Sequence, residues 1–304
     1  MALRTPTVTV RSAPLTGDAH GYYYTQPLPA PELPRLDPFL LLHHHGPMTL
    51  PPGSGMPFGP HPHRGFCTLT VILAGSVVHQ DSHGFRSQVD GTPAAAGAQW
   101  MTAGRGLIHN ESTPKEFADT GGPLELLQLW INLPARLKLT PAHYESLAAG
   151  QVLVRPLPGA APGAGMAAVG ATTLLFTGVR PGLPPSYTTP TGTVSALVRL
   201  PVGTSALVPA PAAQAVLLYV LRGRPTLAGT EAKPRVCAAF AATAATAEIA
   251  VAAGAEEALL FYCAAEPLRE PVVQHGPFVM TTEKEILEAM RDYQMGRMGV
   301  FIDE

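Results

Sequence analysis

The sequence is poor in cysteine and contains no long uninterrupted apolar run. Its three cysteines, Cys67, Cys237 and Cys263, are too few and too scattered for a disulfide framework, which suits a reducing compartment. No stretch reaches the roughly 18 apolar residues of a membrane span. The first residues also lack the apolar core of a signal peptide. These absences predict a soluble, cytoplasmic protein that does not bind membranes.

Charge of either sign is also scarce. Charged residues make up 14% of the chain, against 46% hydrophobic residues, and the net charge is −2. This balance argues against a broad nucleic-acid-binding surface. The 304 residues are enough for two ordinary domains. What the chain has in abundance is 33 prolines and 30 glycines, often between short apolar runs, and this punctuation predicts an all-β protein.

Short apolar and β-branched runs predict the strands of two domains. They lie at residues 7–11, 39–42, 67–73, 77–81, 97–102, 124–133, 194–200, 215–221, 247–251 and 259–263. A stretch rich in proline, glycine and alanine at 151–167 reads as a linker, so we expect domains at 1–150 and 168–304. A short helix is expected at 141–147. An amphipathic helix capped by Thr282 is expected at 281–297.

Two short motifs carry the strongest chemical signal. Residues 61–63 read His-Pro-His, and residues 109–111 read His-Asn-Glu, each next to glycines. Side chains alternate along an extended chain, so His61 and His63 share one face, as do His109 and Glu111. Two facing strands would bring three imidazoles and one carboxylate together. This set suits a divalent metal, above all iron(II) if open positions remain for oxygen chemistry.

Other histidines are weaker candidates. His43, His44 and His45 are consecutive, so a regular strand cannot turn all three toward one ion. They could instead alter the entrance to a pocket. His79 and Asp81 share a face, and the edge of a hairpin explains them more simply than a ligand role does.

Several segments resemble the pirin family, a branch of the cupins. They are His-Pro-His-Arg-Gly-Phe at 61–66, Gln-Trp-Met-Thr-Ala-Gly-Arg-Gly at 99–106 with His109, Leu-Gln-Leu-Trp-Ile-Asn-Leu-Pro at 127–134, and Glu-Pro-Val-Val at 270–273 with Gly-Pro-Phe-Val-Met at 276–280. The resemblance implies two stacked cupin-type β-barrels, a bicupin. The N-terminal barrel would hold one iron(II) or another divalent metal through His61, His63, His109 and Glu111. The C-terminal barrel would hold none.

One position departs from the general cupin pattern. Cupins usually carry a glutamate four residues after the second histidine, where this chain has Cys67. Cys67 could be a soft metal ligand, a redox-sensitive thiol or a small buried strand residue.

The resemblance extends to an activity. Bacterial pirins are similar to quercetin 2,3-dioxygenases, which use O2 to open the heterocyclic ring of a flavonol and release carbon monoxide. Glu111 would then be both ligand and catalytic base. Phe58, Phe66 and Trp100 could contact a flat aromatic substrate, and Arg64 could orient an anion or cap a turn. Ordinary core is the simpler interpretation of each of these aromatic residues.

Two other functions stay open. Some pirins resemble redox-responsive regulators, in which the metal's oxidation state alters a surface that binds a protein partner. Nothing in the sequence resembles a DNA-binding motif, so such a role would act through protein contacts. Another small-molecule oxygenase or isomerase in the same barrel is the third reading.

Overall fold

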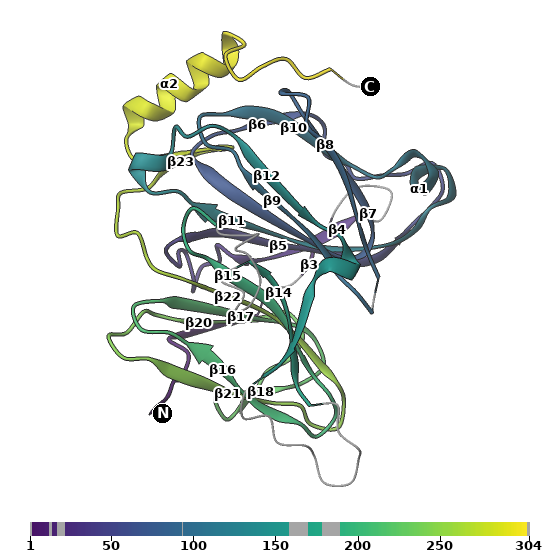
Figure 1. Ribbon diagram of the computed structural model, residues 1–304, viewed down its shortest axis with the longest axis vertical. Helices are drawn as coiled ribbons and strands as arrows, with labels where there is room; N and C mark the ends of the chain where they lie inside the picture. The colour runs from purple at the N-terminus through teal and green to yellow at the C-terminus, as the bar shows by residue number, and fades with distance from the viewer. Residues whose placement is uncertain are drawn as a thin grey trace. The chain divides into compact units, whose positions relative to one another are not determined.

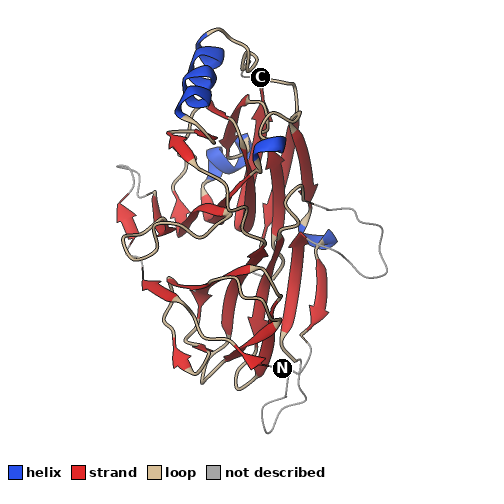
Figure 2. Ribbon diagram, turned by 90° about the vertical axis from the view of Figure 1, so that its left-hand side faces the viewer, coloured by secondary structure: helices blue, strands red, loops and turns tan. Residues whose placement is uncertain are grey.

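The chain consists mainly of β-strands, as predicted. The computed structural model describes residues 2–11, 14–16, 22–92, 94–157, 170–177 and 189–302. Figures 1 and 2 show strands through most of the chain and a helix near its C-terminus. The chain forms two compact units. The first comprises Met1–Ala13, Pro27–Pro38 and Val152–Pro267, and the second comprises Pro14–Gln26, Phe39–Gln151 and Leu268–Glu304.

The second unit contains a ten-stranded sheet in which every pairing that the structure describes is antiparallel. Its main path runs β12-β9-β7-β11-β5-β4-β3, while β6, β8 and β10 branch from it. The strands are β3 (Pro14–Thr16), β4 (Tyr23–Leu28), β5 (Phe39–Leu50), β6 (His61–His63), β7 (Phe66–Asp81), β8 (Arg86–Gly91), β9 (Gly97–Thr102), β10 (Leu107–Ser112), β11 (Gly122–Asn132) and β12 (His143–Leu147).

Strand β7 joins the two parts of this sheet. Its first half pairs with β9 and β11, and its second half, from Gly75 on, pairs with β8 and β10. Gly75 has a φ of +90°, and a Cβ there would lie 2.6 Å from the Pro123 carbonyl oxygen. Only glycine accommodates both the dihedral and the close approach. Residues 67–73 and 77–81 are therefore one strand with a bend, and not the two strands that the sequence predicts.

The first unit contains two sheets around one apolar core. The seven-stranded sheet comprises β2 (Val8–Arg11), β13 (Leu153–Pro156), β14 (Thr172–Thr177), β15 (Val194–Leu200), β17 (Ala215–Arg222), β20 (Val236–Phe240) and β22 (Ala258–Ala265). The five-stranded sheet comprises β1 (Ala2–Leu3), β16 (Ser205–Ala210), β18 (Thr226–Leu227), β19 (Thr230–Glu231) and β21 (Ala247–Ala252). Alternate aliphatic side chains of both sheets form the core, among them Leu218 and Val220 of β17 and Ile249 of β21.

The N-terminal segment belongs to the unit formed mainly by the second half of the chain, and the C-terminal segment belongs to the unit formed mainly by the first half. Strands β1 and β2 pair with β21 and β20 in the first unit. The C-terminal segment belongs to the second unit, where the Val279 amide donates to the Arg64 carbonyl oxygen at 3.0 Å. The Lys138 Nζ also donates to the Val279 carbonyl oxygen, at 2.9 Å. The units therefore differ from the predicted domains 1–150 and 168–304 in where both chain ends lie, because hydrogen bonds tie these ends to distant strands.

The C-terminal segment forms a hairpin and a helix. The hairpin consists of β23 (Val273–His275) and β24 (Phe278–Met280), and the helix is α2 (Glu283–Gln294). Thr282 caps α2 in a capping box with Glu285, as the sequence predicts for Thr282. The buried α2 residues Ile286 and Ala289 join an apolar cluster with Phe278 and Met298. This cluster holds the helix on the second unit.

One predicted helix is wrong, and most of the predicted linker lies outside the residues that the structure describes. The sequence predicts a helix at 141–147, but His143–Leu147 forms β12, which pairs along its whole length with β9. Tertiary pairing overrides the weak local helix preference there. A short helix, α1 (Lys115–Thr120), and 3-10 turns at Ala135–Leu137 and Ala149–Gln151 have no counterpart among the predicted elements. Most of the predicted linker, residues 158–167, lies outside the described residues.

Candidate metal centre

Three histidines converge where β6 pairs with β10. The antiparallel register places His61 opposite His109 and His63 opposite Leu107. Directly opposite residues on one face of such a pair lie close enough for their side chains to touch. One ligand nitrogen from each of His61, His63 and His109 can be chosen so that all lie within 4.8 Å of one another. The structure therefore brings the three predicted histidines together.

Burial keeps two of these histidines neutral. His63 and His109 are 2% and 1% exposed, and burial is the main cause that lowers the pKa of both rings well below the ordinary value. The positive charges that neighbouring histidines would carry lower these pKa values further. A neutral imidazole offers a lone pair to a metal, whereas an imidazolium offers none. His63 and His109 are therefore suited to ligation at neutral pH.

Glu111 follows His109 by two residues in β10, on the same face of the strand, and two hydrogen bonds hold its carboxylate. The Thr70 hydroxyl donates to Oε1 at 3.0 Å, and the Gln128 amide donates to Oε2 at 2.6 Å. Burial raises the pKa of Glu111, while the charge of His61 and these two hydrogen bonds act in the opposite direction. The Glu111 oxygens are not among the atoms that lie within 4.8 Å of one another. Glu111 is therefore beside the triad, with both oxygens already hydrogen-bonded.

Aromatic rings line one side of the triad. The Phe66 and Trp130 rings lie 4.9 Å and 5.1 Å from the His63 ring, centroid to centroid, and 4.5 Å from each other. Nearby, Met101 and Leu107 belong to a buried apolar cluster. The wall beside His63 is therefore apolar and aromatic, and the fully buried Phe66 is part of it.

Trp100, another predicted pocket residue, does not face the site. Trp100 is opposite Leu69, whereas its neighbour Gln99 is opposite Thr70, which bonds Glu111. Because side chains alternate, Trp100 is on the opposite face of the sheet from Glu111, so Trp130 rather than Trp100 flanks the histidines. The Trp100 indole nitrogen donates to the Thr102 hydroxyl at 2.9 Å.

Arg64 and Phe58 also have defined surroundings. The Arg64 guanidinium donates to the Arg105 carbonyl oxygen at 2.6 Å and to Asp292 of α2 at 3.0 Å. These contacts correspond to the structural alternative, with Arg64 fixing a turn and the C-terminal helix. Phe58 is 36% exposed, with its ring 5.7 Å from those of Tyr22 and His45.

Cys67 and the triple histidine are not part of the candidate metal-binding group among the described residues. Cys67 is fully buried in register with Ile131, on the face opposite Phe66, and burial raises the pKa of its thiol to about 12. It behaves as the small buried strand residue that the sequence allows. In β5, His43 shares its register with Gln128, and His44 lies 3.0 Å from Glu125. These histidines form side-chain contacts within the sheet.

Three polar residues around the site carry little functional signal in the sequence. Thr70 lies in a run of β-branched residues that indicates only a strand, and Gln128 stands out only as a residue on one face of a strand. The sequence favours a hairpin edge for His79, but this residue is 1% exposed and its Nδ1 lies 3.4 Å from the His109 Nδ1. The one signal for His79 in the sequence is that it shares a strand face with Asp81. This signal does not reveal which strand lies opposite His79.

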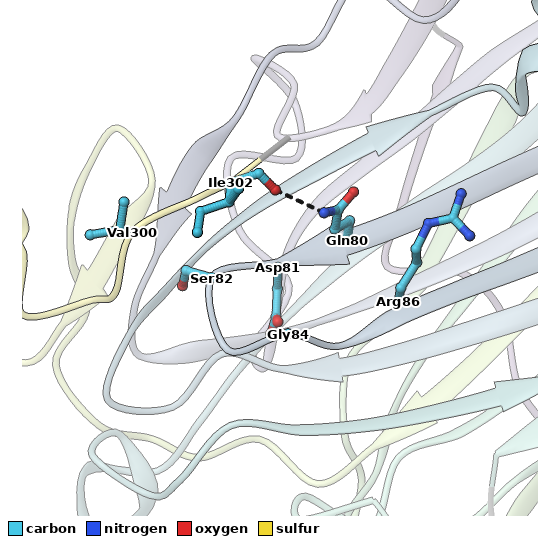
Figure 3. Close-up of a pocket in the computed structure, with 7 residues that line it drawn as sticks. All are labelled: Gln80, Asp81, Ser82, Gly84, Arg86, Val300 and Ile302. Carbon is cyan, nitrogen blue, oxygen red and sulfur yellow. Dashed lines mark hydrogen bonds between the residues drawn. The ribbon is translucent and has the colours of Figure 1, made fainter. Parts of the chain in front are cut away.

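A separate pocket lies at the turn between β7 and β8, where the C-terminal tail passes (Figure 3). Gln80 donates from its amide to the Ile302 carbonyl oxygen at 2.9 Å. None of the three histidines lines this pocket, whose residues are Gln80, Asp81, Ser82, Gly84, Arg86, Val300 and Ile302.

Two family models match the chain. The model described as Pirin matches residues 21–131, and the model described as Pirin C-terminal cupin domain matches residues 196–299. The two ranges together cover more than half of the sequence. This chain belongs to the pirin family. The predicted resemblance is confirmed, and so are the two cupin-type domains of the fold.

Known relatives of this pirin-family chain agree with that assignment. A Pseudomonas aeruginosa protein, named as a candidate quercetin 2,3-dioxygenase, is 34% identical over 93% of this chain and 94% of its own. The crystal structure of a quercetin 2,3-dioxygenase from Acinetobacter baumannii covers 99% of this chain and 100% of its own, with 28% identity and a TM-score of 0.85. The Escherichia coli pirin YhhW, solved in complex with nickel(II), covers 86% of this chain and 99% of its own, with 19% identity and a TM-score of 0.62.

The donor set fits a metal of the kind that this family binds. Pirin and cupin proteins bind a metal, and the histidine triad is the candidate site in this chain. Imidazole nitrogens suit iron, nickel, copper and zinc. Histidines together with one carboxylate are typical ligands of non-haem iron(II). In His61 the Nδ1 atom lies 2.8 Å from the Gly59 carbonyl oxygen, which directs the Nε2 lone pair of this ring toward the triad. Among the described residues, neither helix is long and apolar enough to cross a membrane.

Proposed function

We propose that this pirin-family protein is a dioxygenase that opens the ring of a flavonol such as quercetin with O2. His61, His63, His109 and Glu111 would hold one iron(II) per chain. The observation that carries the proposal is the convergence of three histidine nitrogens within 4.8 Å of one another beside a buried glutamate. The relatives named as quercetin 2,3-dioxygenases supply the substrate class.

Glu111 is the residue we assign to proton transfer. The flavonol hydroxyl must lose a proton before it reacts, and a carboxylate with a raised pKa is a stronger base for that proton. Burial raises the pKa of Glu111 above its ordinary value. Thr70 and Gln128 hold the carboxylate in place from two strands. When bound, the metal would supply Lewis acidity and electron transfer between the flavonol and O2.

The aromatic wall supports a flat substrate. Phe66 and Trp130 present rings next to His63, and aromatic side chains favour stacked or edge-to-face contacts with other rings. Trp130 is only partly buried, whereas Phe66 is fully buried. A flavonol bound beside the triad would gain apolar contact from this wall and give its proton to Glu111.

A second candidate function is regulatory. As a redox-responsive pirin, the protein would act through contacts with a protein partner. The observation that favours this role is a set of exposed apolar side chains at the C-terminal end of the second unit: Leu287 (66% exposed), Met295 (58%), Val300 (70%) and Ile302 (68%). The three free, buried cysteines agree with the cytoplasmic location that we propose for either role.

Anaerobic iron loading followed by oxygen-uptake measurements with a panel of flavonols tests the proposal. We expect about one iron per chain and flavonol-dependent oxygen consumption. Iron-replete protein that consumes no oxygen with any flavonol would reject the dioxygenase and favour the regulator. Protein that binds no divalent metal at all would reject both metal-dependent functions.

A further inference from the structure

His79 is buried against one of the three converging histidines. It lies in β7, where the register places it opposite Glu111 of β10. Its ring centroid is 4.8 Å from that of His109, and the two Nδ1 atoms are 3.4 Å apart. Because one nitrogen must donate and the other accept, one proton is shared between them.

The positions of the protons follow from the neighbours. The His61 Nδ1 donates to the Gly59 carbonyl oxygen, so in the neutral ring the His61 Nε2 carries a lone pair. The His109 Nε2 lies 3.1 Å from this atom and must therefore donate to it. A neutral His109 that is protonated at Nε2 has a bare Nδ1. In this arrangement His79 donates to His109.

A metal bound to the triad would reverse that hydrogen bond. Ligation through the His109 Nε2 requires a lone pair on that atom, so the proton of the neutral ring moves to Nδ1. The His109 Nδ1 then donates, and His79 must accept. An imidazole can change from donor to acceptor by moving its own proton from Nδ1 to Nε2.

The surroundings of His79 fix its ring but not its proton. The Phe85 and Tyr144 rings lie 5.9 Å and 5.4 Å from the His79 ring, and they stack on each other at 4.1 Å. The Tyr144 hydroxyl also donates to Asp81, so this wall is itself anchored. The His79 Nε2 is buried and has no hydrogen-bond partner among the residues that the structure describes. No protein group there favours one tautomer over the other.

We propose that His79 is a positioning residue that orients His109 in both states, donating to it without metal and accepting from it with metal. This inference rests on the proposed metal site. Most metal-ligating histidines donate their second nitrogen to a carboxylate or carbonyl oxygen, which can only accept. A histidine in that place supports the ligand before and after the metal binds.

The direct test follows the tautomers in the wild-type protein. Nitrogen-15 NMR of the histidine rings, with and without one equivalent of Zn²⁺, reports which nitrogen of each ring carries the proton. We expect the His79 proton on Nδ1 without metal and on Nε2 with Zn²⁺. A His79 tautomer that does not change when His109 is ligated would overturn the proposal. Wild-type protein that binds no Zn²⁺ would instead reject the metal site itself.

Metal affinity of variants gives a second test. We expect His79→Phe, which keeps a ring but removes both nitrogens, to weaken Ni²⁺ binding ~10- to 100-fold and to change the visible spectrum of the Co²⁺ form. His79→Gln, whose amide can donate or accept, should lose less. Phe85→Leu is the matched control, because it alters the same wall without removing a nitrogen, and it should bind Ni²⁺ like wild type. Equal Ni²⁺ affinity in folded His79→Phe and wild type would count against the proposal.

Discussion

Gln128 of β11 donates a hydrogen bond of 2.6 Å from its amide nitrogen to Glu111 Oε2, while its amide oxygen accepts from the Trp130 indole nitrogen at 3.2 Å. An indole nitrogen can only donate, so Trp130 fixes the orientation of the Gln128 amide. Gln128 therefore always presents its donor to Glu111. This link stabilises the charged carboxylate against the effect of burial.

Replacing Gln128 should make Glu111 harder to ionise. In Gln128→Leu the carboxylate loses one of its two donors, so the pKa of Glu111 should rise. We expect the pH profile of iron uptake, and of any flavonol turnover, to shift to higher pH. Gln99→Leu is a suitable control, because Gln99 bonds Ser146 rather than Glu111. A profile that stays unchanged in Gln128→Leu would separate Gln128 from the ionisation of Glu111.

Glu111→Gln tests the base directly. The amide keeps an oxygen donor for the metal but cannot accept the substrate proton, so iron should bind, more weakly than in wild type. Flavonol turnover should fall ~10²-fold or more, the usual scale for loss of a general base. Iron content, flavonol affinity and oxygen uptake on one preparation of each protein check this. Unchanged turnover in the iron-replete variant would remove Glu111 from the base role and leave the dioxygenase standing.

His63→Ala should abolish metal binding and leave a folded protein. His63 supplies one of the three converging nitrogens, whereas the stability of each unit comes mainly from its apolar core. Metal analysis should give about one equivalent for wild type and far less for the variant. Thermal unfolding of the two metal-free proteins should be similar. His143→Ala, at an exposed position in β12, controls for loss of a histidine elsewhere, and loss of cooperative unfolding in His63→Ala would show a structural metal.

Acid should destabilise the protein partly through His43. Burial lowers the pKa of His43 to about 4, from an ordinary 6.5. Below pH 6.5 the unfolded chain takes up a proton that the folded chain refuses, so the free energy of unfolding falls as the pH drops from 6.5 to 4, by about 3 kcal/mol. His43→Gln should flatten this fall in urea titrations at about pH 7, 6 and 5, while exposed His143→Gln should not. An identical pH slope in His43→Gln and wild type would contradict the assignment.

Lys138 should be essential for the stability of the loop beside His63. Its buried ammonium donates to the Gly65 carbonyl oxygen at 2.9 Å, to Asn132 Oδ1 at 2.6 Å and to the Val279 carbonyl oxygen. Lys138→Met leaves these buried acceptors without their donor, at about 1–3 kcal/mol for each unsatisfied group. We expect a clear fall in the melting temperature, and none for exposed Lys284→Met. Equal melting temperatures would show that other donors replace the lysine.

The sequence alone determined the features that depend on local periodicity and spacing. The alternation of His61 with His63 and of His109 with Glu111 follows from the two-residue period of a strand, whatever the rest of the fold does. The capped helix after Thr282 and most strand positions are local in the same sense. The family segments also lie in the sequence itself, so the fold class could be predicted from them.

The tertiary structure decided everything that depends on which strands pair. Trp100 and Trp130 both lie in apolar strands, and only the register of β9 and β11 against β7 puts Trp130 on the His63 side and Trp100 on the other. The pairing of β7 with β10 brings His79 next to His109 across 30 residues of sequence. Strand register is a long-range property, set by the packing of a whole face, and no local pattern around His79 encodes it.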